Sequence, residues 1–160
     1  DGILEVSPPK NGEILFWKIR NALVKLRDLG LHIKWISFDS YQSRDSIQLL
    51  RQQGFATGMV SVDTSTEPYD LLKTVIYSGS LKAPEHDKCR KELISLEKIA
   101  RTGKIDHPAN GSKDCSDSLA GVVYGLYHRR EIWGLHGVPM LKVYQSKSQV
   151  SADETSKETE

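Results

Sequence analysis

Apolar positions follow two different spacings along the chain, and the change from one to the other predicts alternating helices and strands. Between residues 14 and 29 the apolar side chains recur roughly every 3.6 positions, which predicts a helix ending before Gly30. Residues 32–39 carry a nearly continuous apolar run, typical of a strand buried on both faces. A second helix is predicted at 43–54 and a second strand at 56–62. This order predicts two adjacent parallel strands joined by a right-handed crossover.

The rest of the chain predicts shorter elements and a polar tail. We expect a strand at 3–6 and further helices at 66–79, 86–103 and 113–130. Residues 146–160 have almost no apolar side chains and are expected to be a disordered tail. The fold class is therefore α/β, with one layered domain over residues 1–145.

Composition restricts the class of protein without identifying it. The chain has 160 residues, of which 38% are hydrophobic and 27% charged, as in ordinary soluble domains. No apolar run approaches the roughly 20 residues that span a bilayer, so no membrane partner is expected. The N-terminus has no secretory pattern, and two cysteines are too few for a disulfide framework. These features favour the cytoplasm.

Basic residues are concentrated in one part of the chain, although the net charge is only +1. Between Leu71 and Lys104 there are eight basic residues against four acidic ones. This segment is either a solvated helix face or a surface that contacts a nucleic-acid backbone without reading bases. The candidates for such contacts are Lys73, Lys82, Lys88, Arg90 and Lys91.

Three aspartates are the main candidates for chemistry. Asp39 is the last residue of the strand 32–39, at the end where ligand crevices form in parallel sheets, but taken alone it is better explained as a cap of the next turn. Asp114 and Asp117 are neighbours at the start of the helix 113–130. One capping residue, either Ser112 or Asp114, is enough for the start of that helix. Capping therefore does not explain why both Asp114 and Asp117 are present.

The same helix indicates how its acids reach the sheet. Gly121 and Gly125 lie on the side of the two aspartates and allow another element to approach closely. Asp114 lies nearer the apolar arc than Asp117 and is predicted to face inward. Neighbouring carboxylates repel unless a cation lies between them, and oxygen ligands favour Mg²⁺ or Mn²⁺.

Other catalytic motifs are absent from the sequence. It contains no P-loop, nucleophile elbow, H-E-x-x-H or C-x-x-C motif. The five histidines form no ligand pair at helical spacing, and the two cysteines show no metal-ligand spacing.

Three stretches together resemble one family: "FDSYQSRDSIQLLRQQGF", "SVDTSTEPYDLLKTVIYSGSL" and "HPANGSKDCSDSLAGVVYGL". From about residue 3 to 127 the chain resembles the C-terminal nuclease domain of the large terminase subunit of tailed bacteriophages. The resemblance implies an RNase H-like mixed sheet flanked by helices. It also implies an endonuclease that cuts concatemeric double-stranded DNA in the host cytoplasm. The implied partners are an upstream ATPase domain of the same polypeptide, the portal and the small terminase subunit.

The resemblance also implies roles for single residues. Asp39 corresponds to the second metal-binding carboxylate, Asp114 to the third, and Asp117 to an accessory ligand of a site for two Mg²⁺ or Mn²⁺ ions. We expect the carboxylates of Asp39 and Asp114 to lie roughly 4–6 Å apart. Lys113 is either a solvated lysine or a contact to the scissile phosphate.

The chain departs from the family at its start. The first two strands of the family's sheet, one of which carries the first carboxylate, are missing, so we expect an N-terminally truncated domain, and it stays open whether this chain is active alone. Two alternatives remain open. One is a non-catalytic interaction module that docks to the portal or another packaging component, and the other is a different RNase H-like nuclease such as a resolvase.

Overall fold

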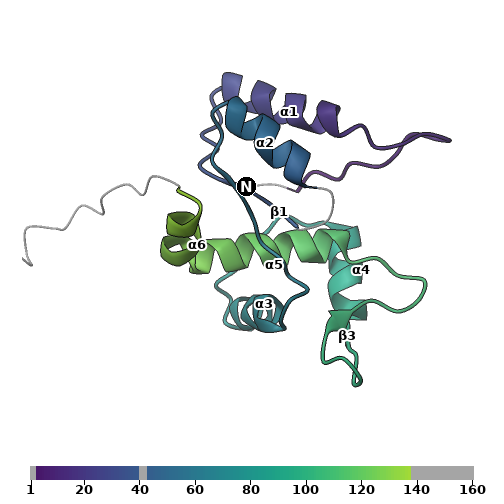
Figure 1. Ribbon diagram of the computed structural model, residues 1–160. Coiled ribbons are helices and arrows are strands. Elements are labelled where there is room, and N and C mark those ends of the chain that lie inside the picture. The colour runs from purple at the N-terminus through teal and green to yellow at the C-terminus, as the bar shows by residue number, and fades with distance from the viewer. Residues whose placement is uncertain (1–2, 40–42, 138–160) are drawn as a thin grey trace, which may run out of the picture.

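A computed structural model describes residues 3–39 and 43–137, in a mixture of helices and strands as predicted. The predicted tail at 146–160 and the predicted domain end at 145 lie outside the described residues. The helices are α1 (Phe16–Asp28), α2 (Arg44–Gln52), α3 (Glu67–Tyr77), α4 (Asp87–Ser95), α5 (Asp114–Tyr127) and α6 (Arg129–Leu135) (Figure 1). The strands are β1 (Ile36–Phe38), β2 (Thr57–Met59), β3 (Glu97–Lys98) and β4 (Ile105–Asp106).

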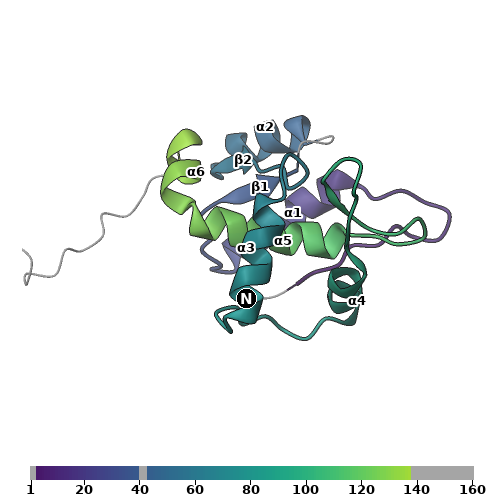
Figure 2. The ribbon, with the colours of Figure 1, turned by 90° about the horizontal axis from the view of Figure 1, so that it is seen from below.

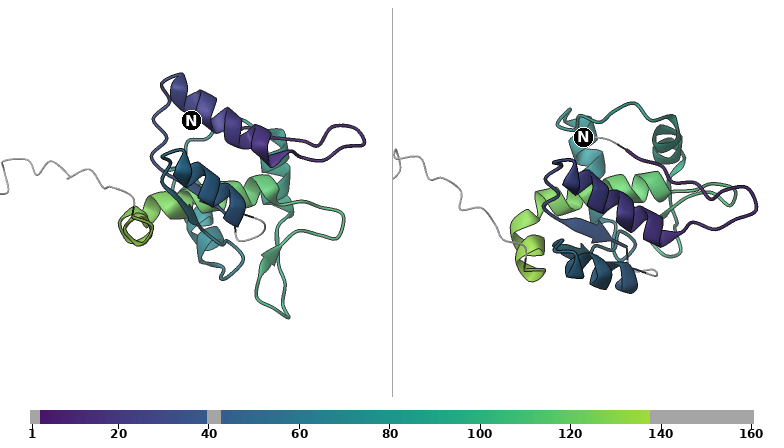
Figure 3. Two further views of the ribbon diagram at one scale, coloured as in Figure 1. Left: turned by 45° about the horizontal axis from the view of Figure 1, so that its top comes forward. Right: turned by 90° about the horizontal axis from the view of Figure 1, so that it is seen from above.

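The predicted strand–helix–strand unit is present. β1 and β2 pair in parallel, with Ile36 opposite Thr57 and Phe38 opposite Met59, and α2 connects them. The right-handed crossover stays a prediction. α1 and α2 lie side by side on one face of the two strands, and α5 lies on the other (Figures 1 and 3).

β1 is less buried than its apolar sequence predicts. All three of its residues are half-buried, so the prediction of a strand buried on both faces is wrong. Among residues 3–39 and 43–137, β1 pairs with β2 alone, so its other edge has no strand partner there.

The hydrophobic core lies where α3 packs against α5 (Figure 2). It consists of Val62, Tyr69, Leu72, Ala120 and Val123. Leu72 and Ala120 are almost completely buried, and side chains from α4 and β4 close the core at one end. Because α5 supplies two of the core residues, its position relative to α3 is fixed by this packing.

Five predicted elements differ from the structure, and two of them, the strands expected at 32–39 and 56–62, are each only three residues long. Residues 3–6 form no strand, because they lie beside α4 rather than beside another strand. The helix expected at 86–103 ends at Ser95, because β3 and β4 pair as an antiparallel ribbon and Gly103 turns the chain at φ +69°. The helix expected at 113–130 ends at Tyr127 and is followed by α6. No helix in the described part of the chain is long and apolar enough to span a bilayer.

Candidate functional site

Acidic side chains meet beside the carboxyl ends of the two parallel strands. Asp39 directly follows β1, and Asp63 comes four residues after the end of β2. Asp117 lies in the first turn of α5, on the opposite side. A pocket of about 170 Å³ is lined by Asp39 and Asp117, together with Ser37, Phe38, Val60, Val62, Ser118, Gly121 and Val122. The pocket therefore combines carboxylates from the sheet and from the facing helix.

Lys113 links two of these carboxylates. Its Nζ donates a hydrogen bond to Asp63 and lies 3.6 Å from Oδ2 of Asp117. The Lys113 side chain is only 14% exposed. Burial opposes its charge, but the hydrogen bond to Asp63 and the charges of Asp117, Asp63 and Asp106 outweigh burial and raise the pKa of Lys113. Lys113 is therefore a cation held inside the acidic cluster.

Asp117 lies at the centre of the cluster. Its side chain is 22% exposed, and the Tyr69 hydroxyl donates a hydrogen bond to its Oδ1. Burial raises the pKa of Asp117, and the negative charges of Asp63 and Asp39 add to that shift, against the opposing effects of Tyr69 and Lys113. Burial and the bond to Asp117 likewise raise the pKa of the Tyr69 hydroxyl. A cation beside Asp117 would favour its ionised form.

The donor set fits a hard divalent cation. When ionised, Asp39, Asp63 and Asp117 carry three negative charges, of which Lys113 offsets one. The available donors are oxygens, which Mg²⁺ and Mn²⁺ prefer. Among the described residues, however, the oxygens of these three carboxylates do not all lie within 4.8 Å of one another, so they would have to draw together around an ion.

The start of α5 is held by a residue from α4. The buried Glu92 carboxylate accepts hydrogen bonds from the Ser112 hydroxyl at 2.5 Å and from the Ser116 backbone N–H at 2.9 Å. The sequence led us to expect that Ser112 or Asp114 would cap the helix through its own side chain. Neither does. Glu92 thus accepts a hydrogen bond from one of the backbone N–H groups that the start of a helix leaves without an intrahelical partner.

The glycines of α5 allow the helix to approach the strands. Gly121 and Gly125 are both buried. A Cβ atom on Gly125 would lie 2.9 Å from Cζ3 of Trp35, the residue just before β1, whereas a Cβ on Gly121 would lie 3.7 Å from Val62. The predicted close approach is confirmed. It depends on the absence of a side chain at Gly125 and not at Gly121.

The prediction that Asp114 faces inward is wrong. Asp114 is exposed and is not among the residues that line the pocket with Asp39; Asp117 has that place. The side of α5 that faces the sheet is set by Gly125 and by the contact of Asp117 with Tyr69. Asp63 was not among the candidates chosen from the sequence, although it directly follows the strand predicted at 56–62.

The predicted DNA-contacting residues lie on the surface, with two exceptions. Lys73 is on α3, Lys82 is in the loop that follows, and Arg90 and Lys91 are on α4; all four are exposed. Lys88 is half-buried and bonds Glu5 at 2.6 Å. Lys113, as described above, is inside the acidic cluster.

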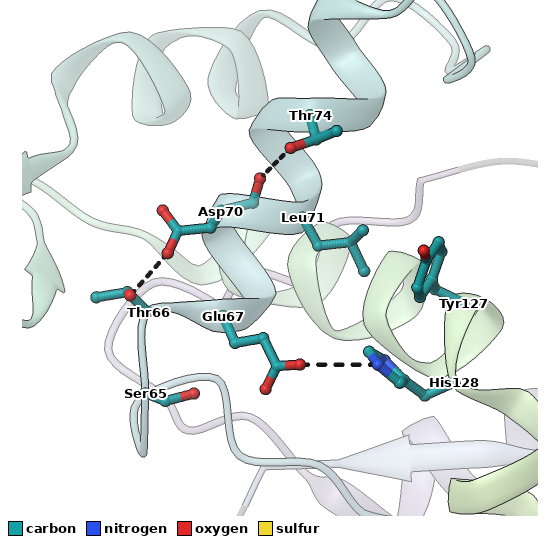
Figure 4. A pocket seen from close by; sticks show the side chains of 8 residues that line it. All are labelled: Ser65, Thr66, Glu67, Asp70, Leu71, Thr74, Tyr127 and His128. Carbon is teal, nitrogen blue, oxygen red and sulfur yellow. Dashed lines mark hydrogen bonds and ion pairs between the residues drawn. The ribbon is translucent and has the colours of Figure 1, made fainter.

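A larger pocket lies elsewhere, between the start of α3 and the end of α5 (Figure 4). It has a volume of about 420 Å³. Some of its polar side chains pair with one another: Thr66 donates to Asp70, and His128 lies 3.7 Å from Glu67, although Nδ1 of His128 is buried without a hydrogen-bond partner. The smaller pocket is the one lined by the predicted site residue Asp39, so we take it as the candidate for chemistry.

Comparison of the chain with protein-family models, with curated proteins and with solved structures finds no match.

Proposed function

We propose that this chain is the RNase H-like nuclease domain of a phage-type terminase, a metal-dependent endonuclease acting on double-stranded DNA. The observation that carries the proposal is the meeting of Asp39 and Asp117 at one pocket, with Asp63 joined to Asp117 through Lys113. The resemblance of the three sequence stretches supplies the substrate class. It also suggests the host cytoplasm, the upstream ATPase domain, the portal and the small subunit as the setting.

In this proposal Asp39, Asp63 and Asp117 hold Mg²⁺ or Mn²⁺. Such ions supply an activated water and charge stabilisation for in-line phosphodiester cleavage. Tyr69 orients the Asp117 carboxylate by donating a hydrogen bond to Oδ1. Lys113 holds Asp63 and Asp117 together and provides a positive charge for an approaching phosphate. Asp114 is not assigned a role in binding the metal.

The exposed basic residues of α3, α4 and the loop between them are proposed to contact the DNA backbone. Lys73, Lys82, Arg90 and Lys91 carry positive charge at the surface, where phosphate contacts give affinity without base recognition. Binding should weaken steeply as salt concentration rises.

A second candidate function is a non-catalytic docking module of the packaging machinery. Lys113 favours it, because this ammonium group already gives Asp63 and Asp117 a cation. A buried network of this kind can serve to fix a conformation rather than to bind metal. The two candidates differ in whether the pocket takes up Mn²⁺.

Both candidates can be tested with one set of variants. Mn²⁺ binding is measured by calorimetry, and Mn²⁺-dependent cleavage is measured on supercoiled plasmid. Asp39→Asn, Asp63→Asn and Asp117→Asn are compared with Asp114→Asn, which makes the same charge change at an exposed site in the same helical turn as Asp117. Circular dichroism checks that each variant is folded.

We expect the first three variants to lose Mn²⁺ binding and cleavage, and Asp114→Asn to keep both. A chain that binds Mn²⁺ but does not cut plasmid would refute the endonuclease proposal for this chain. A chain that neither binds Mn²⁺ nor cuts would favour the docking module. If Asp114→Asn lost activity and Asp117→Asn kept it, the assignment of the pocket would be wrong.

A further inference from the structure

A second group of possible metal ligands lies away from the acidic pocket. Glu5 comes from the N-terminal segment, His86 from the residue before α4, and Cys115 from the first turn of α5. One ligand atom of each lies within 4.8 Å of the others. The N-terminal segment runs past α4 at this point (Figure 2). Three parts of the chain that are distant in sequence therefore bring a carboxylate, an imidazole and a thiol together.

The donors have the chemistry of a zinc site rather than a magnesium site. Sulfur and imidazole nitrogen select borderline and soft metals, and zinc accepts a carboxylate beside them. Zinc bonds of about 2.0–2.3 Å in a tetrahedron place donor atoms roughly 3.3–3.8 Å apart. Since the ligand atoms lie within 4.8 Å of one another, they have to close by at most about 1.5 Å to reach this geometry. Glu5 is exposed and lies outside any helix or strand, so its side chain has room to make this movement.

Neighbouring groups hold two of the donors in place. Lys88 Nζ donates to Oε1 of Glu5 at 2.6 Å, which attaches the N-terminal segment to α4. The backbone N–H of Cys89 donates to Nδ1 of His86 at 3.2 Å. A neutral imidazole has one nitrogen lone pair, so metal binding would replace this single cap bond. The imidazole is thus already turned toward the start of α4.

We propose that Glu5, His86 and Cys115 bind one zinc ion, with solvent in the fourth position, and that this ion fastens the N-terminal segment to α4 and α5. The site does not rest on the nuclease proposal, because it shares no ligand with Asp39, Asp63 and Asp117. Cys89 is buried three residues after His86 and is not one of the ligands.

Cobalt is the probe, because Co²⁺ bound to a thiolate gives an intense near-ultraviolet charge-transfer band. The reduced, metal-free chain is titrated with Co²⁺ and then with Zn²⁺, which displaces cobalt. We expect one equivalent of Co²⁺ to give the band, and Zn²⁺ but not excess Mg²⁺ to remove it. The Asp117→Asn variant should give the same band, which separates this site from the acidic pocket.

Ligand variants identify the donors. Cys115→Ser should abolish the band, whereas Cys89→Ser, a matched change at the other cysteine, should keep it. His86→Asn removes the imidazole but retains a good helix cap, and it should weaken Zn²⁺ binding about tenfold or more, as should Glu5→Gln. The proposal is overturned if the wild-type chain gives no band. It is also overturned if folded Cys115→Ser keeps the band or folded Cys89→Ser loses it.

Discussion

The Gly125→Ala variant tests whether α5 packs so closely against Trp35 that position 125 has no room for a side chain. A Cβ there would lie 2.9 Å from Cζ3 of Trp35, closer than carbon atoms normally come, so the indole ring or the helix has to move. Such overpacking costs about 1–3 kcal/mol. Alanine also gains about 1 kcal/mol over glycine in a helix interior. The net expectation is a loss of roughly 0–2 kcal/mol of unfolding free energy.

Gly121, one turn earlier on the same face of α5, provides the matched control. A Cβ there would lie 3.7 Å from Cγ1 of Val62, which is ordinary van der Waals contact. Gly121→Ala should therefore gain about 1 kcal/mol from helix propensity alone. The two variants make the same chemical change in the same helix, so their difference of about 1–3 kcal/mol isolates the contact with Trp35.

Urea denaturation followed by circular dichroism measures both free energies. A thermal melt should separate the two midpoints by roughly 2–12 °C for a chain of this size. If Gly125→Ala were as stable as Gly121→Ala, α5 would not be packed against Trp35 at the distance described. The close approach of α5 would then not be what brings Asp117 to the strand ends.

Two further predictions concern the start of α5. Glu92→Ala should lower the unfolding free energy by about 3 kcal/mol or more, because Ser112 and Ser116 each lose a charged, buried acceptor. A urea-denaturation loss below about 1 kcal/mol would contradict this account of the cap. The affinity for Mn²⁺ should fall as pH is lowered through the raised pKa of Asp117, because the protonated carboxyl does not bind metal. Calorimetry that showed constant affinity down to about pH 4 would refute that expectation, since an ordinary aspartate titrates near 3.9.

The sequence was informative where local pattern decides structure. The spacing of apolar residues predicted α1, α2 and α3 to within a few residues, and the strand–helix–strand order predicted the parallel pairing of β1 and β2. Asp39 could be chosen because a residue that ends a parallel strand faces the crevice side of a sheet. The same rule would have selected Asp63, which directly follows the strand predicted at 56–62.

Other features depended on partners that are distant in sequence. The helical spacing from Asp87 continued past Ser95, but pairing of β3 with β4 ended the helix. The cap of α5 comes from Glu92, more than twenty residues earlier, and no local pattern at Ser112 or Asp114 indicates it.

Tertiary packing alone decided which aspartate of α5 enters the pocket. Asp114 and Asp117 are neighbours on one helix, and a difference in rotation about the helix axis is enough to exchange their roles. That rotation is fixed by the fit of Gly125 under Trp35 and by the hydrogen bond from Tyr69 to Asp117. The grouping of Glu5, His86 and Cys115 likewise follows only from packing, since their ligand atoms meet across three separate segments. The sequence by itself determined which local elements form and which residue types are available for chemistry. The long-range contacts, whose energies depend on geometry that spacing does not encode, decided which of those residues meet.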